Sequence, residues 1–371
     1  MKRFAAVLAT LSFLGACSGD GTNPFDPPTA ATTDPSTINN KYLFDLTDKL
    51  TMNSVTYDQT NNELLINNLP FDGPSQRYEH RRLQNGVDVF RSIQTPTTGR
   101  VRSYAVFMKN ANAEVTAAVG ETWAGFGYAG ANVKRAAYGL PSGVGEYVYL
   151  GTYGAVRTRD DGPRLELVTG DVELLLDTGD FDPTTSAADS DTTLEGAIVG
   201  SVRNRLRTDP DGNAISNQLP NISLVLVQYD PATGSFVDGE VTTYFGLDVR
   251  DTGEWEGLIS GPQGETLAGY VVMTGTAEIQ NVRYEVIDWT NPVTGETGTA
   301  EGYTTEEDYD RIFALVNAGQ QVPLETAVLP AGAVANGPAR IEEIQFESTA
   351  EAREVGVFST NQQPTNTTPL P

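Results

Sequence analysis

The clearest pattern of apolar and polar positions lies between about Glu146 and Val286. Short segments rich in β-branched and aromatic residues recur there, and each ends at a cluster of Gly, Pro, Asp or Asn that is typical of turns. The segments are 147–153, 165–177, 194–204, 222–229, 235–245, 254–259 and 267–277. Because one antiparallel sheet of so many strands protects its edges best by closing, the pattern predicts a β-barrel of about eight strands.

The phase of the apolar positions changes within the segment 165–177. Leu165 and Leu167 occupy odd positions, whereas Val172 and Leu174 occupy even ones, with Gly170 between them. One extra residue in a strand shifts the phase in this way, so the pattern predicts a β-bulge at Gly170. Glycines inside the other segments favour a small barrel over a flat sheet, because they permit sharp corners.

The pattern in region 41–143 predicts a smaller β-rich domain before the barrel. Asn85-Gly86 is the strongest hairpin signal in the chain, and a second hairpin is expected around Asn61-Asn62. A further strand is expected over 101–109. The alanine-rich segment 111–119 is compatible with a short helix, and periodicity alone does not decide whether it forms one.

One helix is predicted after the barrel segments, over 304–318. Thr304 and Glu307 have the spacing of a capping box, and Gly319 provides a stop. Its apolar face consists of Tyr309, Ile312, Phe313 and Val316. We expect this helix to pack on the barrel wall or to plug the barrel mouth. The domain 144–360 then closes with a last strand at either 282–288 or 353–359, and the tail 361–371 is predicted to be disordered.

The N-terminus has the features of a bacterial lipoprotein. Residues 1–16 form a signal peptide with a basic start and a short apolar core. The sequence 14–17, Leu-Gly-Ala-Cys, matches a lipobox and predicts lipidation of Cys17, the only cysteine in the chain. Ser18 follows in place of the aspartate expected for retention at the inner membrane, which favours the outer membrane. Residues 17–40 are polar and proline-rich, as in a disordered tether.

Several glycine-aromatic motifs resemble a known family. They are Tyr153-Gly154, the Gly-x-Phe-x-x-Gly of 234–239, the Gly-x-Trp-x-Gly of 253–257 with Gly-Pro-Gln-Gly-Glu at 261–265, and the final Val-Gly-Val-Phe of 355–358. Together they resemble the barrel domain of the transferrin-binding protein B superfamily of outer-membrane lipoproteins. The resemblance implies a handle-like domain before the barrel and a binding function connected with iron. The long interval between 277 and 355 departs from the family pattern.

Charge narrows the range of partners. The formal net charge is −25, and removal of Lys2 and Arg3 with the signal peptide leaves 22 basic and 49 acidic residues, a net charge of −27. Such a chain is excluded as a nucleic-acid-binding protein. The acidity can serve to attract a basic partner or simply to keep the chain soluble.

The inventory of catalytic groups argues against an enzyme. His80 is the only histidine, and no nucleophile elbow, phosphate loop or paired-cysteine metal motif occurs. The sharpest alternative is an aspartic-type protease built from two Asp-Thr-Gly triplets, at Asp177 and Asp251, since two adjacent carboxylates can share one proton. Both triplets fall where the strand pattern predicts turns. Asp209-x-Asp211-x-Asn213 is also expected to be a turn, and no metal site is predicted.

Four residues of the first domain are candidates for a ligand site: Tyr78, His80, Arg81 and Arg82. Histidine can ligate heme iron and arginine can pair with heme propionates, and some heme-capturing lipoproteins similar to this family use a clamp of loop residues. The alternative is a solvated hairpin face.

The sequence therefore predicts a non-enzymatic outer-membrane lipoprotein that binds a protein, or heme as a cofactor-like ligand. A structural envelope lipoprotein and the protease stay open as alternatives.

Overall fold

The computed structural model describes residues 39–42, 52, 54–67, 76–93, 102–120, 128–143, 145–161, 165–181, 195–215 and 218–364. The predicted signal peptide, Cys17, most of the tether and the end of the predicted tail lie outside these residues. Within the described part of the chain, no helix is long and apolar enough to cross a membrane.

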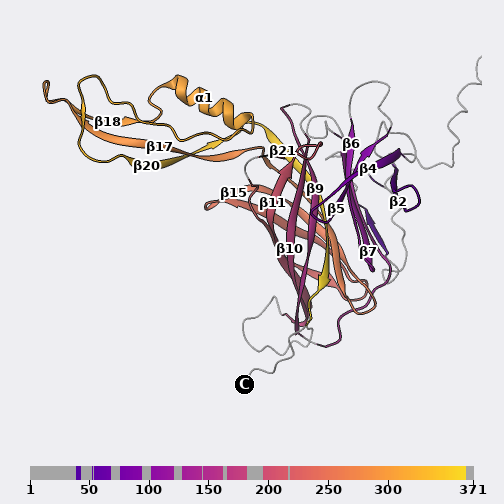
Figure 1. Ribbon diagram of the computed structural model, residues 1–371. Helices are drawn as coiled ribbons and strands as arrows, with labels where there is room; N and C mark the ends of the chain where they lie inside the picture. Colours follow the sequence, from indigo (N-terminus) through magenta and orange to yellow (C-terminus); the bar gives the residue numbers. More distant parts are fainter. Residues whose placement is uncertain are drawn as a thin grey trace, which may run out of the picture.

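Eight antiparallel strands close into a barrel (Figure 1). They are β9 (Gly145–Arg159), β10 (Leu165–Phe181), β11 (Glu195–Thr208), β13 (Ile222–Asp230), β14 (Ser235–Phe245), β15 (Asp248–Ser260), β16 (Thr266–Thr276) and β21 (Glu351–Gln362). Strand β21 pairs with both β16 and β9, and β10 pairs with β11, so the ring has no open edge. The predicted barrel is confirmed, and the last strand is the later of the two alternatives. Residues 361 and 362, expected in the tail, belong to this strand.

Aromatic rings fill one part of the barrel interior. Trp255 packs against Phe236 and Phe358, and all three are fully buried. Glycines on neighbouring strands make room for such rings: a Cβ on Gly356 would lie 2.1 Å from the hydroxyl oxygen of Tyr153. The strand glycines thus serve the close packing of the interior as well as the curvature of the wall.

The first domain is an eight-stranded antiparallel sheet that packs on the outside of the barrel. In spatial order its strands are β1 (Asn40–Tyr42), β8 (Ala129–Arg135), β7 (Ala113–Gly120), β6 (Ser103–Lys109), β5 (Val87–Ser92), β4 (Gln76–Gln84), β3 (Glu63–Asn67) and β2 (Ser54–Asp58). A shared core joins Val106 and Val115 of this sheet to Val156, Val355 and Val357 of the barrel. The hairpins predicted at Asn61-Asn62 and Asn85-Gly86 are present.

Residues 113–119 of the undecided segment belong to strand β7, not to a helix. Its residues are buried on both faces, because one face contacts the barrel and the other contributes Ala118 to a second core with Tyr78 and Phe90. A strand buried on both sides has no apolar–polar alternation, which is why periodicity did not identify it.

A bulge is present beside Gly170, but the extra residue is in the neighbouring strand β11 and not in β10. The register between β10 and β9 is continuous, whereas the register between β10 and β11 shifts between Thr169 and Asp171. Asn204 of β11 lies opposite this shift and has a φ of 53°. The change of phase in β10 has another cause: Leu165 and Leu167 face outward into the core shared with the first domain.

Residues 278–348, between β16 and β21, form an arm that projects from the barrel (Figure 1). It contains β17 (Ile279–Thr290), β18 (Thr297–Glu301), β19 (Val334–Ala335), β20 (Arg340–Glu347) and the helix α1 (Glu306–Asn317). The expectation that the helix packs on the barrel wall or plugs its mouth is wrong, since its buried residues Ile312 and Val316 contact Val282 and Phe346 of the arm's own sheet.

The N-terminal cap of α1 is one residue later than predicted. The hydroxyl of Thr305 accepts a hydrogen bond from the backbone N–H of Asp308 at 3.2 Å and donates one to the Asp308 carboxylate at 2.8 Å. Thr304 and Thr305 both precede an acidic residue by three positions, so spacing alone did not distinguish them. The predicted stop at Gly319 is present, with a φ of 65°.

Candidate functional site: an acidic arm and the charge network at its base

The arm leaves and re-enters the barrel at one point. The backbone N–H of Ala277 donates to the carbonyl of Ala350 at 2.8 Å, and Thr276 pairs with Glu351 in the ladder between β16 and β21. The two ends of the insertion are therefore adjacent, and any control of the arm's orientation has to act at this junction.

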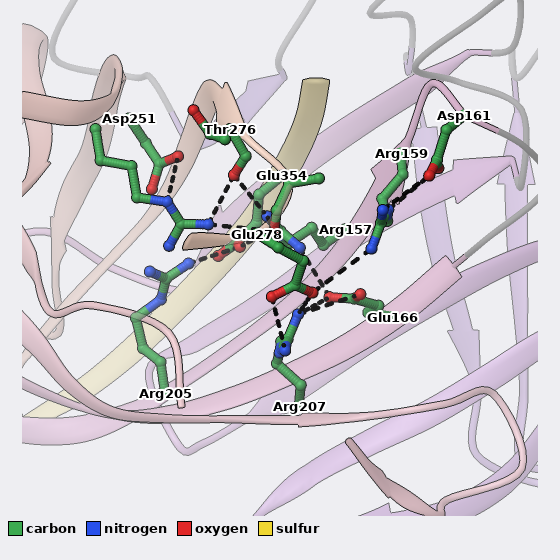
Figure 2. A network of polar contacts seen from close by, with 12 residues as sticks. Arg157, Arg159, Asp161, Glu166, Arg205, Arg207, Asp251, Thr276, Glu278 and Glu354 are labelled. Atoms are coloured by element: carbon green, nitrogen blue, oxygen red, sulfur yellow. Dashed lines mark hydrogen bonds and ion pairs between the residues drawn. The ribbon is translucent and has the colours of Figure 1, made fainter. Parts of the chain in front are cut away.

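Arginines and carboxylates are buried inside the barrel at this junction (Figure 2). Arg157 and Arg159 come from β9, Arg205 and Arg207 from β11, Glu166 from β10 and Glu354 from β21; Glu278 immediately precedes β17. We call these seven residues the lumen network. Since buried charges are costly unless paired, their side chains should have close partners of opposite charge.

The bulge in β11 turns two of these arginines inward. Before Asn204, the inward positions of β11 are even, as at Ile198 and Val202. After it they are odd, so that Arg205 and Arg207 are buried and Leu206 between them is 49% exposed. The Asn204 amide donates to the Asp171 carboxylate at 2.7 Å and holds the bulge in place.

Each carboxylate of the lumen network contacts arginine. Glu354 accepts hydrogen bonds from Arg205 Nη2 at 2.6 Å and from the Tyr153 hydroxyl at 2.7 Å. Glu166 accepts from Arg157 Nη1 at 2.9 Å. Burial alone would raise the pKa of Glu166, but the positive charges of Arg157 and Arg207 outweigh burial and hold this pKa below its usual value.

Glu278 joins the arm to this network. Its carboxylate accepts a hydrogen bond from Arg207 Nη1 at 2.5 Å and lies 3.6 Å from Arg159 Nη1. Arg159 also donates from Nη2 to the carbonyl of Asn317 at the C-terminus of α1, at 2.5 Å. Arg157 donates to the carbonyl of Ala277 at 2.7 Å. Charged barrel side chains thus bind both the entry of the arm and the end of its helix.

The arm itself is strongly acidic. Residues 278–348 contain 13 acidic and three basic residues, a net charge of −10. Each basic residue already has an acidic partner: Arg283 contacts Glu343, Arg311 contacts Glu325, and Arg340 contacts Asp288. The arm therefore carries ten more acidic than basic side chains and is joined to the barrel through the lumen network.

The four candidate ligand residues of the first domain have separate partners. Tyr78 is fully buried in the core of its own sheet. His80 Nε2 lies 2.8 Å from Asp88 Oδ1, and Arg81 contacts Glu79. Arg82 donates to the carbonyl of Pro210 at 2.7 Å and so connects this hairpin to the barrel. The structure does not bring these residues together around one space, and heme binding at this hairpin stays a prediction.

The two Asp-Thr-Gly triplets are in strands, not in turns. Asp177 lies in β10 and Asp251 in β15, with three barrel strands between them in either direction. Asp251 is buried and accepts a hydrogen bond from Thr243 at 2.5 Å. Asp177 alternates with the inward-facing Leu174 and Leu176, which places it on the outer side of the wall. The geometry keeps the two carboxylates apart.

Asp209 forms the predicted turn. Its carboxylate accepts hydrogen bonds from the backbone N–H groups of Asp211 at 2.9 Å and Asn213 at 2.8 Å.

Among the residues that the structure describes, no group of three or more His, Cys, Asp or Glu side chains is arranged to hold a metal ion.

Comparison with known proteins does not assign the chain to a family. No family model and no curated protein matches the chain. The chain is similar to a solved structure of a variant of the vaccine antigen transferrin-binding protein B from Haemophilus parasuis Hp5, with 12% identity and a TM-score of 0.29. The match covers 88% of this chain and 45% of that one, so this chain spans less than half of the other's length. The closed barrel and the arm are established here by strand pairing, independently of this match.

Proposed function

We propose that the chain is a non-enzymatic outer-membrane lipoprotein that binds a protein partner through its acidic arm. The observation that carries this proposal is the mounting of the arm: an element with a net charge of −10 is fixed to a closed barrel by buried arginines. A surface held in one orientation loses little conformational entropy on binding. Its charge attracts a basic partner over distance.

The lipid anchor is part of the proposal and gives a prediction of its own. Metabolic labelling with palmitate is expected to mark the wild-type chain and to leave Cys17→Ser unlabelled, because the acyl chains attach through Cys17. Subcellular fractionation should place the labelled chain with the outer membrane. Label that persists on the variant would show that Cys17 is not the lipidated residue.

Retention of a partner is the test of the binding function. The mature chain with Cys17→Ser, immobilised and exposed to envelope and surface extracts, is expected to retain a defined protein with saturable binding. The retained protein should be lost at high salt, since exposed charge pairs are screened there. Absence of any saturable partner across several extracts would favour the structural envelope role instead.

A further inference from the structure

One face of the arm's sheet is covered and the other is open. Helix α1 packs over the even-numbered residues of β17, where Val282 and Val286 are buried (Figure 1). Side chains alternate along a strand, so the odd-numbered residues of β17 face the opposite side. There Asn281 and Arg283 are exposed and Ile279 and Glu285 are half-buried. We call this the open face.

The open face is hollowed into a groove where the arm meets the barrel. The groove has a volume of about 550 Å³ and is lined by Ile279 and Asn281 of β17, Ile341 of β20, Leu324 beside β17, and Gln218 from the barrel. Ile341 is 45% exposed and Leu324 is 51% exposed. Exposed branched apolar side chains in a concave site favour a partner that inserts apolar side chains of its own.

Strand β20 provides backbone groups along the same face. It pairs with β17 on one side and, within residues 218–364, with no strand on the other. Its register places Ile341, Glu343 and Glu347 on the open face, opposite Glu285, Arg283 and Ile279 of β17. An added extended segment would complete the hydrogen bonding of this edge and set alternate side chains over the open face.

The charge of the open face selects the occupant. Three carboxylates, Glu285, Glu343 and Glu347, lie there with one arginine, Arg283, which already contacts Glu343 at 3.3 Å. The surplus is two negative charges on an arm that is acidic as a whole. A second copy of this chain would bring another strongly negative surface to the site, which disfavours self-association through this edge.

We propose that β20 and the open face bind an extended segment of a basic partner protein, with lysine or arginine side chains beside Glu343 and Glu347 and apolar side chains in the groove. This proposal rests on the proposed binding function and locates its binding site on the arm. At roughly 3.3 Å per residue, the eight residues of β20 accommodate a segment of similar length.

A library of random 12-residue peptides displayed on phage tests the site. Selection on the immobilised mature chain with Cys17→Ser is expected to enrich peptides with lysine or arginine at alternate positions and apolar residues between them. Synthetic peptides of the selected sequence should bind at least tenfold more weakly to Glu343→Lys/Glu347→Lys, because two attractive charge pairs become repulsive.

A matched control separates the site from general attraction. Glu296→Lys/Glu301→Lys makes the same change in net charge at exposed positions of the same arm, away from the open face. It should weaken binding less than threefold, and both double variants should keep the unfolding midpoint of the parent. Ile341→Ser should weaken binding while Val293→Ser, at the exposed β17–β18 turn, should not.

Two outcomes would overturn the proposal: enrichment of acidic or purely apolar peptides, or equal losses for the two charge-reversal variants. The result is distinguishable from a failure of the binding function itself. If extracts yield a saturable partner that still binds the Glu343→Lys/Glu347→Lys variant, the binding function is supported and the site at β20 is refuted.

Discussion

Replacing Glu354 with alanine is expected to lower the free energy of unfolding by about 3 to 5 kcal/mol. Its carboxylate is the acidic partner of Arg205, at 2.6 Å, and both side chains are almost completely buried. Removal of the carboxylate leaves the Arg205 guanidinium in the barrel with the carbonyl of Pro220 as a neutral acceptor. It also removes the acceptor of the Tyr153 hydroxyl. A buried charge without a counter-charge is among the most destabilising changes known.

Urea unfolding followed by tryptophan fluorescence measures this effect, since Trp255 lies in the same barrel interior. Glu351→Ala is the matched control on the same strand. The side chains of Glu351 and its partner Arg353 are both partly exposed, so its loss should change the free energy of unfolding by less than about 1 kcal/mol. Arg205→Met combined with Glu354→Leu should recover most of the lost stability, because the pair is then replaced by apolar side chains. A Glu354→Ala variant as stable as Glu351→Ala would show that Arg205 does not need this counter-charge.

The barrel was predictable where its strands have one face in the interior and the other in solvent. In β13 and β14 buried residues alternate with more exposed ones, apart from one pair of successive exposed residues in each strand, so the apolar pattern has a period close to two. The pattern failed where tertiary contacts bury the second face as well. Strand β7 and the first half of β10 are both covered by a neighbouring sheet. The alternation of apolar and polar positions is absent in β7, and in β10 it falsely indicated an extra residue.

The burial of two of the four arginines in the lumen network could be predicted from the sequence. Arg157 and Arg159 continue the odd positions of Tyr153 and Ala155, which face the interior, so their burial follows from the strand pattern. Arg205 and Arg207 do not continue the phase of Ile198 and Val202, since Asn204 adds a residue between them. An asparagine in a strand is compatible with a positive φ, yet its position alone does not establish a bulge.

Local sequence patterns could not predict which carboxylates pair with these arginines. Glu354 lies 149 residues after Arg205, and Glu278 lies 71 residues after Arg207. Their proximity depends on which strands are neighbours in the closed barrel and on where the arm is inserted. The Asp-Thr-Gly triplets illustrate the converse case, because turn chemistry read from three residues was overridden by long strands that continue through Asp177 and Asp251.

The lumen network connects stability of the barrel to the orientation of the arm. The arginines of β9 and β11 stabilise the barrel interior only with their carboxylates, and one of those carboxylates, Glu278, belongs to the arm. The same contacts therefore satisfy the buried charges and fix the direction in which the arm projects. A long insertion without such contacts would swing about its two adjacent ends at Ala277 and Ala350.

Loss of Glu278 is accordingly expected to free the arm. Glu278→Ala removes the contacts with Arg207 and Arg159 but leaves Arg207 within 3.3 Å of Glu166, so the free energy of unfolding should fall by about 3 kcal/mol, at the lower end of the range for a broken buried pair. The larger effect should be on orientation. Spin labels at Leu247, in the β14–β15 turn, and Val293, in the β17–β18 turn, report it, because both positions are almost fully exposed and the chain from Ser18 onward has no cysteine of its own.

Distances between the two labels, measured by double electron–electron resonance, should form a narrow distribution in the parent and a broad one in Glu278→Ala. Glu347→Ala is the control, since it removes an exposed carboxylate of the same arm without a contact to the barrel network. Glu278→Gln, which keeps the side-chain length and one hydrogen-bond acceptor, should give an intermediate width and covers the case in which the alanine variant does not fold. An unchanged distribution in a folded Glu278→Ala variant would mean that the arm is oriented by its remaining contacts, namely those of Arg157 with Ala277 and of Arg159 with Asn317, and not by the buried carboxylate.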